Sequence, residues 1–520
     1  MKLHPHAYTS WWDLHAWAGA ITSIVLNVMF FAGAFALFYE EIAIWQDPRS
    51  HRVVDDARCE GVPLEPLVRS AIARFGARPT TITAAVPSDA CAPIWIDVGG
   101  ESERRTTVLA DPTTGALLDE RSVVATFLLD LHFLYDESTI GEWGMYTAGA
   151  LAIVMLLTLV TGVLVHLKDL VRQLHQLRLR ERIRFVWSDL HKVLGVMGLP
   201  FQIGMAFSGA LLSLALPMMW AWQGPVFGGD TTLAERELLG YEAPPATTGA
   251  PGSRLTIDEL VAHARRARSD LRAEHVRVHG YGDAGSTVDV SGRLEETRIA
   301  TGRVRLRATD GSVVGVAMPE TSGAATRVMN WIFGLHYARL GGDVAKLLYA
   351  LLAMLACATI LSGNWIWLAR RDPARRHAGH RALARLTIAG GLGVAPAVGA
   401  MFLANRIAPI DASWHADAEV IAFVLAWALT AVVGFVVRSE LDAAIVALIA
   451  GALAFAATPV ASVAVTPLHI GRALMDGHWA VASVDVGLLA MAAMLVSAAL
   501  LARRIADAKA RTERLGGARG

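Results

Sequence analysis

The chain carries few charged residues for its length. Lys, Arg, Asp and Glu make up 18% of its 520 residues, against 54% that are hydrophobic, whereas a soluble protein usually carries about 25% charged residues. This shortage argues against an ordinary soluble protein. The formal net charge is zero, so no excess of positive charge indicates a nucleic-acid partner, and none is expected.

Cysteine is also scarce. Of the three cysteines, Cys357 lies in an apolar run and is expected to pack there, whereas Cys59 and Cys91 share one polar segment. If that segment faces an oxidising compartment, the two either form a disulfide or stay as free thiols. The apolar runs hold almost no thiolate or carboxylate ligands, which disfavours a Zn or Mn transport site inside them.

A nucleotide-binding unit is missing as well. No strand–GxGxxG–helix unit occurs between the apolar runs. The stretch GGLGVAPAVGA, from Gly390 to Ala400, lies inside an apolar run without a preceding strand, so its small residues are predicted to allow close helix packing. Any electrons that the protein uses would therefore come from a quinol or from a separate reductase.

Long apolar runs are what the sequence has in abundance. A run of about 18 residues or more crosses the ~30 Å hydrocarbon core of a bilayer. Eight runs reach that length, at about 16–38, 143–165, 192–218, 344–368, 383–404, 418–437, 443–463 and 483–503. The first is too long and too aromatic for a signal peptide. The fold class is therefore an all-α polytopic membrane protein with about eight transmembrane helices.

Lys and Arg gather after the second, fourth and eighth runs, at residues 168–184, 370–385 and 503–514. With eight spans, all three clusters lie on one side of the membrane. The positive-inside rule makes that side cytoplasmic, so both termini are expected in the cytoplasm.

Two long polar segments remain for the opposite face. Each begins with a helix-like stretch, with Thr256 as a candidate cap in the second, and continues with short β-type runs and turns such as Asp111–Gly115 and Asp310–Ser312. Such a pattern predicts two small α+β modules. The expected domains are 1–45 with the first span, 46–140 as module 1, 141–219 with spans two and three, 220–340 as module 2, 341–372 with span four, and 373–520 as a C-terminal extension with spans five to eight.

The sequence Trp-x-Asp-Leu-His-x-x-x-Gly occurs twice, as WWDLHAWAG from Trp11 to Gly19 and as WSDLHKVLG from Trp187 to Gly195. At the same offset, Met29, Phe31, Gly33 and Ala34 match Met205, Phe207, Gly209 and Ala210. This internal repeat predicts a core of four helices built from two similar halves.

Four histidines recur with the repeat. His15 and His191 begin the first and third spans, while His132 and His336 precede the second and fourth. Imidazoles from facing helices can occupy both axial positions of a haem, so two such pairs would hold two haems across the bilayer. The alternatives are histidines that are only solvated or capping, and metal transport. His166, at the end of the second span, is a further candidate ligand, proton partner or propionate partner.

Asp13 and Asp189, two residues before a histidine, either orient an imidazole or cap a helix. Among the remaining histidines, His415, His469 and His478 are expected in short loops of the last four spans. Those spans carry no charged motif in their centres, and their role stays open between stabilising the core, binding quinol and docking a partner.

The DLH segments, LHFLY, LHYAR, the TG and SG pairs near the ends of spans two and four, and DPTTG together resemble the PepSY-associated transmembrane family, over about residues 10–372. The resemblance implies a bacterial inner-membrane protein with PepSY-like periplasmic modules. Members include ferric-siderophore reductases that bind haem b. By that resemblance His15, His132, His191 and His336 are the haem ligands, with His166 as a further candidate.

The expected function is a membrane oxidoreductase that passes electrons to a ferric siderophore or another ferric chelate in the periplasm. Trp95, Tyr281, Arg303, Arg305 and Arg307 are candidates for the surface that docks the chelate. Two other classes of protein stay open. The first is a transporter of a small solute or iron chelate, which Pro200 and Gln202 in span three would favour. The second is a non-redox envelope protein that binds peptidases.

Overall fold

The structure is a computed structural model. It describes residues 5–48, 63–76, 78–87, 94–100, 105–111, 114–118, 121–136, 140–167, 178, 183–239, 244–294, 301–319, 323–339, 341–370 and 377–517. Cys59 and Cys91 lie outside these residues. The chain divides into a membrane unit, made of Met1–Pro48, Arg121–Leu214 and Asp343–Gly520, and a sheet unit, made of Arg49–Glu120 and Ala215–Gly342.

Eight helices among the described residues are long and apolar enough to cross a membrane, as the sequence predicted. They are α1 (Pro5–Ala36), α5 (Glu142–His166), α7 (Ile183–Ser213), α12 (Gly342–Ala369), the continuous run of α13, η3 and α14 (Ala378–Leu386, Thr387–Leu392 and Val394–Ile407), α15 (His415–Val436), α16 (Glu440–Val465) and α18 (Trp479–Gly517). Among the described residues, the membrane unit also contains three short helices, α2 (Tyr39–Gln46), α4 (Val124–Phe133) and α17 (Ile470–Met475). The chain is thus a multi-pass membrane protein.

The first four long helices form a loosely packed group. Helix α5 packs against both α1 and α7. Helix α12 reaches α7 through the stacked rings of Trp187 and Trp365, 6.3 Å apart, and reaches α1 through a hydrogen bond from Asn364 Nδ2 to Ser23 Oγ of 2.8 Å. Side chains therefore bridge helices that do not approach each other closely, which leaves space between them.

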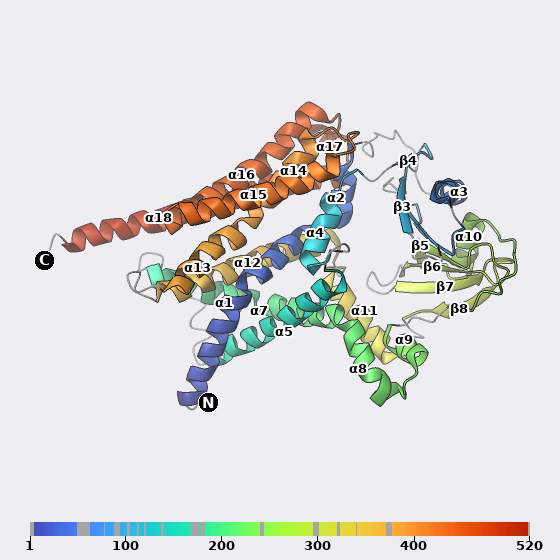
Figure 1. The fold of residues 1–520 in the computed structure, drawn as a ribbon, viewed down its shortest axis with the longest axis horizontal. Coiled ribbons are helices and arrows are strands. Elements are labelled where there is room, and N and C mark those ends of the chain that lie inside the picture. Colours follow the sequence, from blue (N-terminus) through green and yellow to red (C-terminus); the bar gives the residue numbers. More distant parts are fainter. Residues whose placement is uncertain are drawn as a thin grey trace. The chain divides into compact units, whose positions relative to one another are not determined.

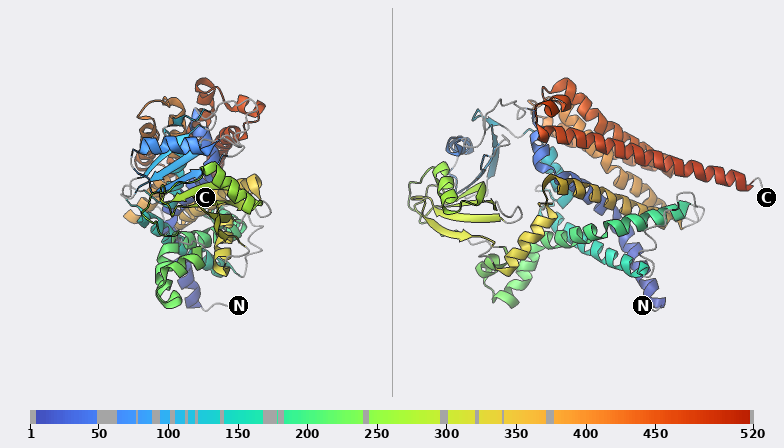
Figure 2. Two further views of the ribbon diagram at one scale, coloured as in Figure 1. Left: turned by 90° about the vertical axis from the view of Figure 1, so that its right-hand side faces the viewer. Right: turned by 180° about the vertical axis from the view of Figure 1, so that it is seen from behind.

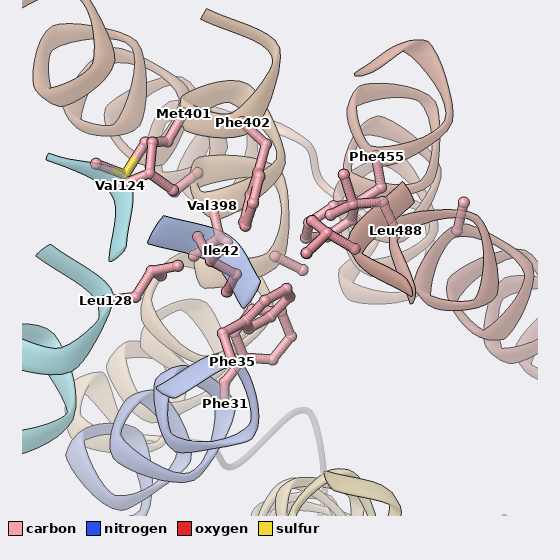
Figure 3. Packing of buried hydrophobic residues seen from close by; sticks show 14 of the residues in the cluster. Phe31, Phe35, Ile42, Val124, Leu128, Val398, Met401, Phe402, Phe455 and Leu488 are labelled. Atoms are coloured by element: carbon pink, nitrogen blue, oxygen red, sulfur yellow. The ribbon is translucent and has the colours of Figure 1, made fainter. Parts of the chain in front are cut away.

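The last four long helices pack on α1, α2 and α4. Figure 3 shows the shared core, in which Phe31 and Phe35 of α1 face Phe402 of α14 and Phe455 of α16. The rings of Phe35 and Phe455 stack with centroids 5.9 Å apart. Helix α18 runs beyond the ends of α15 and α16 (Figure 2). Cys357 is buried at the edge of this core, as predicted.

The glycine-rich stretch of the extension is helical, as predicted. A Cβ on Gly399 would lie 2.9 Å from the Cβ of Ala454 in α16, so this glycine allows the two helices to pack closely. The first residues of the stretch, 390–392, belong to η3, a π-helix, and Asn27 of α1 donates from Nδ2 to the Gly391 carbonyl at 2.8 Å.

The sheet unit contains an eight-stranded antiparallel sheet with the order β4-β3-β2-β1-β5-β6-β7-β8, and Figure 1 labels its strands β3 to β8. The first polar segment supplies β1 (Thr81–Ala85), β2 (Ile94–Gly99), β3 (Arg105–Ala110) and β4 (Leu117–Leu118), and the second supplies β5 (Leu271–His279), β6 (Thr287–Leu294), β7 (Thr301–Arg307) and β8 (Val313–Ala317). Strands β1 and β5 pair from Thr81–His279 to Ala85–His275. The two expected modules are therefore halves of a single sheet.

Two helices share a hydrophobic core with this sheet, α3 (Leu64–Phe75) from the first segment and α10 (Ile257–Ala267) from the second. Helix α10 begins with a capping box in which Thr256 and Glu259 bond each other's backbone N–H groups, which confirms the predicted cap. The described part of the unit also contains the helices α8 (Ala215–Phe227), α9 (Thr231–Leu239) and α11 (Ala324–His336).

A buried ion pair ties α3 to the segment before α10. Arg254 donates to both carboxylate oxygens of Glu65, at 2.8 and 2.9 Å, and the Ile257 N–H donates to the same group at 3.0 Å. Burial alone would raise the pKa of Glu65, but the hydrogen bonds from Arg254, Arg69 and Ile257 outweigh it and lower that pKa to about 2.

Candidate functional site

The two repeated histidines face each other inside the membrane unit. The imidazole centroids of His15, on α1, and His191, on α7, are 6.1 Å apart. His15 donates from Nδ1 to the carbonyl oxygen of Thr158 on α5 at 2.8 Å, and His191 donates from Nδ1 to the carbonyl oxygen of Thr359 on α12 at 2.9 Å. A carbonyl only accepts, so both rings carry their proton on Nδ1 when neutral and leave the Nε2 lone pair available to a metal.

Glycines make room for these rings at matching places. A Cβ on Gly162 would lie 2.9 Å from His15 Cε1, and one on Gly363 would lie 3.2 Å from His191 Cε1. Each glycine follows its hydrogen-bonding threonine by four residues, one helical turn along the same face. The structure thus gives the TG and SG pairs a physical reason, because the glycine admits the imidazole.

The closing glycines of the two Trp-x-Asp-Leu-His-x-x-x-Gly segments also have equivalent surroundings. A Cβ on Gly19 would lie 3.7 Å from the methyl of Thr158, and one on Gly195 would lie 3.6 Å from the methyl of Thr359. Histidine and glycine are one turn apart on their helix, and both contact the same threonine of the neighbouring helix. The repeat therefore builds the same half-site twice.

A cavity of about 570 Å³ lies beside the two imidazoles. All four of α1, α5, α7 and α12 line it, and its residues include Leu26, Met155, Leu159, Val163, Val196, Leu199 and Ile360 as well as both histidines. Its size falls within the ~300–1,000 Å³ that is usual for small-molecule and cofactor sites. Among the described residues no group of three or more His, Cys, Asp and Glu side chains is placed to hold a metal ion.

Polar and cationic side chains line part of the same cavity. His166, Lys192 and Arg370 are among them, and the guanidinium of Arg370 lies 4.4 Å from the centroid of the Trp12 ring. The Trp12 and His166 rings are 6.1 Å apart. His166 thus belongs to the same cavity as His15 and His191, where it can serve as a ligand or as a partner of an acidic group.

Asp189 does not orient an imidazole. Its carboxylate receives two hydrogen bonds from the side chain of Arg178, at 2.8 and 2.9 Å, while backbone carbonyls orient both histidines. Asp13 lines the cavity. Of the two roles that the sequence left open for Asp189, orienting an imidazole is wrong, because its carboxylate is paired with Arg178 in a bidentate contact.

His132 shows the same local arrangement at the other end of α1. It lies on α4 and donates from Nδ1 to the carbonyl oxygen of Met29 at 2.8 Å. A Cβ on Gly33, one turn further along α1, would lie 2.7 Å from His132 Nδ1. His132 therefore shares two features with the inner histidines: a carbonyl acceptor for Nδ1 and a neighbouring glycine.

His336 is the last residue of α11 in the sheet unit, next to Tyr337, whose ring centroid is 5.7 Å away. The structure thus brings His15, His166 and His191 together at one cavity and places His132 at a second position in the membrane unit. His336 lies in the other unit.

A family model described as PepSY-associated TM region matches residues 12–370. The chain belongs to the PepSY-associated transmembrane family. Among relatives, the uncharacterized protein PA4219 of Pseudomonas aeruginosa is 27% identical over 391 residues, which are 73% of this chain and 95% of that protein. The family match includes His15, His132, His166, His191 and His336 and ends before the extension.

Beyond the match to the PepSY-associated transmembrane family, the extension holds a buried ionisable cluster that the sequence interpretation missed. His415, Glu419 and Asp485 are fully buried and Arg406 is 4% exposed. These residues lie near helix ends and are far apart in sequence, so no motif marks them. His415 had been expected in a loop; it is instead the buried first residue of α15.

Some of the residues expected to dock a chelate have structural partners within the sheet unit. Arg305 forms a buried ion pair with Asp289, with Nε and Oδ1 2.6 Å apart. Burial alone would raise the pKa of Asp289, but the bonds from Arg305 and His279 hold it well below its ordinary value. Tyr281 lies under Arg254, 4.9 Å from its guanidinium. Arg305 and Tyr281 therefore contribute to the packing of the sheet unit.

Proposed function

We propose that the protein is a haem-b-containing membrane reductase that passes electrons across the inner membrane to ferric chelates such as siderophores. The observation that carries this proposal is the pair formed by His15 and His191, whose free Nε2 atoms border one cavity. Bound between imidazoles, a haem supplies one-electron transfer.

The residues present fit such a group in three respects. The His15 and His191 rings lie close together, with centroids 6.1 Å apart, and would hold the haem iron through their Nε2 atoms. The Nδ1–H···O=C bonds fix the tautomer that binding requires. Lys192 and Arg370 offer positive charge to the two carboxylates of a haem, and His166 adds a further polar contact.

A second haem would be held by His132, with His336 as its partner. The repeat matches Met29 and Gly33, which receive His132, with Met205 and Gly209 on α7. The Met29 carbonyl lies fourteen residues beyond His15 on the continuous helix α1, or about 21 Å along its axis. Two sites at that spacing would divide the passage of an electron across the bilayer into shorter steps.

Orientation and partners complete the proposal. The positive-inside rule, applied to the basic segments, supports cytoplasmic termini. The His15–His191 site would then lie on the cytoplasmic side, and the sheet unit, with two PepSY-like halves, would lie in the periplasm. The donor would be a quinol or a separate reductase. A ferric chelate is a suitable electron acceptor, because hard oxygen chelators bind Fe(III) more strongly than Fe(II). Reduction of the iron would therefore release it from the chelate.

A transporter is the second candidate. Gln202 is 3% exposed and lines the cavity, and its Nε2 has no hydrogen-bond partner among the described residues. A solute with an acceptor group could use it.

Absorption spectra of the purified protein before and after dithionite, with a pyridine haemochrome count, decide between these functions. The reductase predicts about two b-type haems per chain. His191→Ala should lose one of them while the fold is kept, whereas the matched control His377→Ala, at an exposed histidine outside the cavity, should keep both. A colourless protein from haem-replete cells would remove the reductase and leave the transporter or a non-redox envelope protein.

A further inference from the structure

Two helices of the sheet unit, α8 and α11, are connected in sequence to membrane-spanning helices. Only Leu214 separates α7 from α8, and residues 337–341 separate α11 from α12. Successive spans cross a bilayer in opposite directions, so the end of α7 and the start of α12 lie on the same side of the membrane. Helix α8 therefore begins, and α11 ends, close in sequence to one surface of the bilayer.

Helix α8 is apolar around its whole circumference. It carries no charged residue, its one side chain with a polar group apart from the indoles is that of Gln223, and Met219 is its one buried residue. Trp220 and Trp222, which are 58% and 46% exposed, point about 200° apart around the helix axis. A helix that is hydrophobic all round is normally covered by protein or lipid, yet α8 is largely uncovered.

Helix α11 has one apolar face that is exposed. Val328, Trp331 and Leu335 follow one another at intervals of four and three residues, which places them on the same face, and each is 43–58% exposed. On the opposite face, Thr326 is buried and donates to the Glu237 carbonyl of α9 at 3.0 Å. One face of α11 thus packs within the sheet unit, and the apolar face remains exposed.

The length of α8 indicates how such a helix can meet lipid. Its 13 residues are fewer than the ~20 that cross a bilayer. A short apolar helix of this kind lies either in a protein core or along the membrane surface, and its exposure argues against the core. Exposed apolar surface on this scale marks a binding surface for a protein or a membrane.

Exposed tryptophans of the membrane unit identify lipid as the partner. Trp143 in the first turn of α5, Trp414 directly before α15 and Trp479 at the start of α18 are each more than half exposed. With eight alternating spans, these three helix ends lie on the side of the membrane where α8 begins. Tryptophan is enriched where a bilayer meets water, because its ring is apolar and its N–H is polar. The tryptophans of α8 and α11 continue this belt.

We propose that α8 and α11 lie along the bilayer surface, with their exposed aromatic and aliphatic side chains among the lipid headgroups and the upper acyl chains. The partner is a zwitterionic lipid surface, because α8 has no charged residue and the exposed face of α11 is apolar. The two helices then hold both ends of the second polar segment at the membrane. This inference does not depend on the proposed reductase or on haem.

Photocross-linking from single positions tests what covers the two helices. Benzoylphenylalanine is placed at Trp220, Trp331 or Val314 of the full-length protein in phosphatidylcholine nanodiscs, and the irradiated protein is weighed intact. Val314 is the matched control, because it is 45% exposed in the same unit but lies on the edge strand β8. The variants at Trp220 and Trp331 should gain the mass of one phosphatidylcholine, at low and at high salt alike, and the variant at Val314 should not.

Three results would overturn the proposal. The first is a cross-link from Trp220 or Trp331 to a second copy of the chain, which would make this surface a protein interface. The second is an absence of lipid adducts at both positions while benzoylphenylalanine at Trp143 reacts with lipid. The third is an equal yield of lipid adduct at Val314.

Hydroxyl-radical oxidation of the wild type in the same nanodiscs gives a test without any substitution. Trp331 lies in the tryptic peptide 328–339, and the valines of β8 lie in the tryptic peptide 308–327. After correction for intrinsic reactivity, Trp331 should be protected and the valines should be oxidised. Oxidation of Trp331 in proportion to its 55% exposure would show that water, and not lipid, covers α11.

Discussion

Gly162→Ala tests the histidine site without removing a ligand. The added Cβ would lie 2.9 Å from Cε1 and 3.2 Å from Nδ1 of His15. Carbon atoms pack best at about 3.5–4.0 Å, so the ring would have to retreat by roughly 0.6 Å. The bond from His15 Nδ1 to Thr158 is 2.8 Å long, and a shift of that size stretches it beyond the usual ~3.2 Å limit.

A stretched Nδ1–H···O=C bond no longer fixes the orientation of the His15 imidazole. Loss of such an outer partner typically costs about 10–100-fold in metal affinity, so Gly162→Ala should bind the inner haem weaker by that factor. Gly363→Ala places its Cβ 3.2 Å from His191 Cε1 and should have a smaller effect. Gly33→Ala, at 2.7 Å from His132, should weaken the outer haem instead.

Gly204→Ala is the matched control, because it is also a helical glycine and nothing lies within 4 Å of an added Cβ. It should keep both haems and gain up to about 1 kcal/mol of helix stability. The assay is the rate at which each variant loses haem to excess apomyoglobin, with the α-helical circular dichroism as a check of folding. Equal loss rates for Gly162→Ala and Gly204→Ala would refute the reasoning.

Three further predictions concern the sheet unit, each measured by hydrogen exchange of its strand amides in the full-length protein and corrected for the intrinsic rate. The pKa of Glu65 is about 2 in the folded state, below its ordinary 4.5, so its ~3 kcal/mol of stabilisation should be complete above about pH 4.5 and lost as the pH falls toward 2. Glu65→Gln should abolish that loss. Equal protection of the wild-type amides above pH 4.5 and near pH 2 would contradict the prediction. Thr256→Ala removes the capping box and should lower the free energy of unfolding by about 1 kcal/mol. Unchanged protection of the strand amides would contradict this prediction. Leu260→Ala opens a cavity at a fully buried position and should cost about 2–5 kcal/mol, whereas exchange like that of the wild type would show that the core can collapse around it.

The sequence predicted the features that depend on neighbouring residues. Runs of apolar residues gave the eight membrane helices, and the repeat located the histidines that the structure gathers around one cavity. The helix cap at Thr256 and the turn at Asp111, where the Gly115 N–H donates to the Asp111 carbonyl at 2.9 Å, followed from a few neighbouring residues.

Contacts between residues distant in sequence could not be predicted in this way. The pairing of β1 with β5 joins two strands that are separated in sequence by the membrane helices α5 and α7, and no residue pattern within either strand identifies the other as its partner. Arg178 and Asp189 are close in sequence, but whether Asp189 contacts an imidazole or a guanidinium depends on how the side chains lie in the folded protein. The cluster of Arg406, Glu419 and Asp485 forms only when three helices of the extension pack together.

The pairing of β1 with β5 has a consequence for the biogenesis of the protein. β1 is synthesised before α5 and α7, and β5 only after both. Until the second segment arrives, β1 carries a row of unpaired N–H and C=O groups along one edge, and such edges recruit other strands. Completion of the sheet must therefore wait for insertion of the intervening helices, and the half-made sheet is the stage at which a chaperone would be most needed.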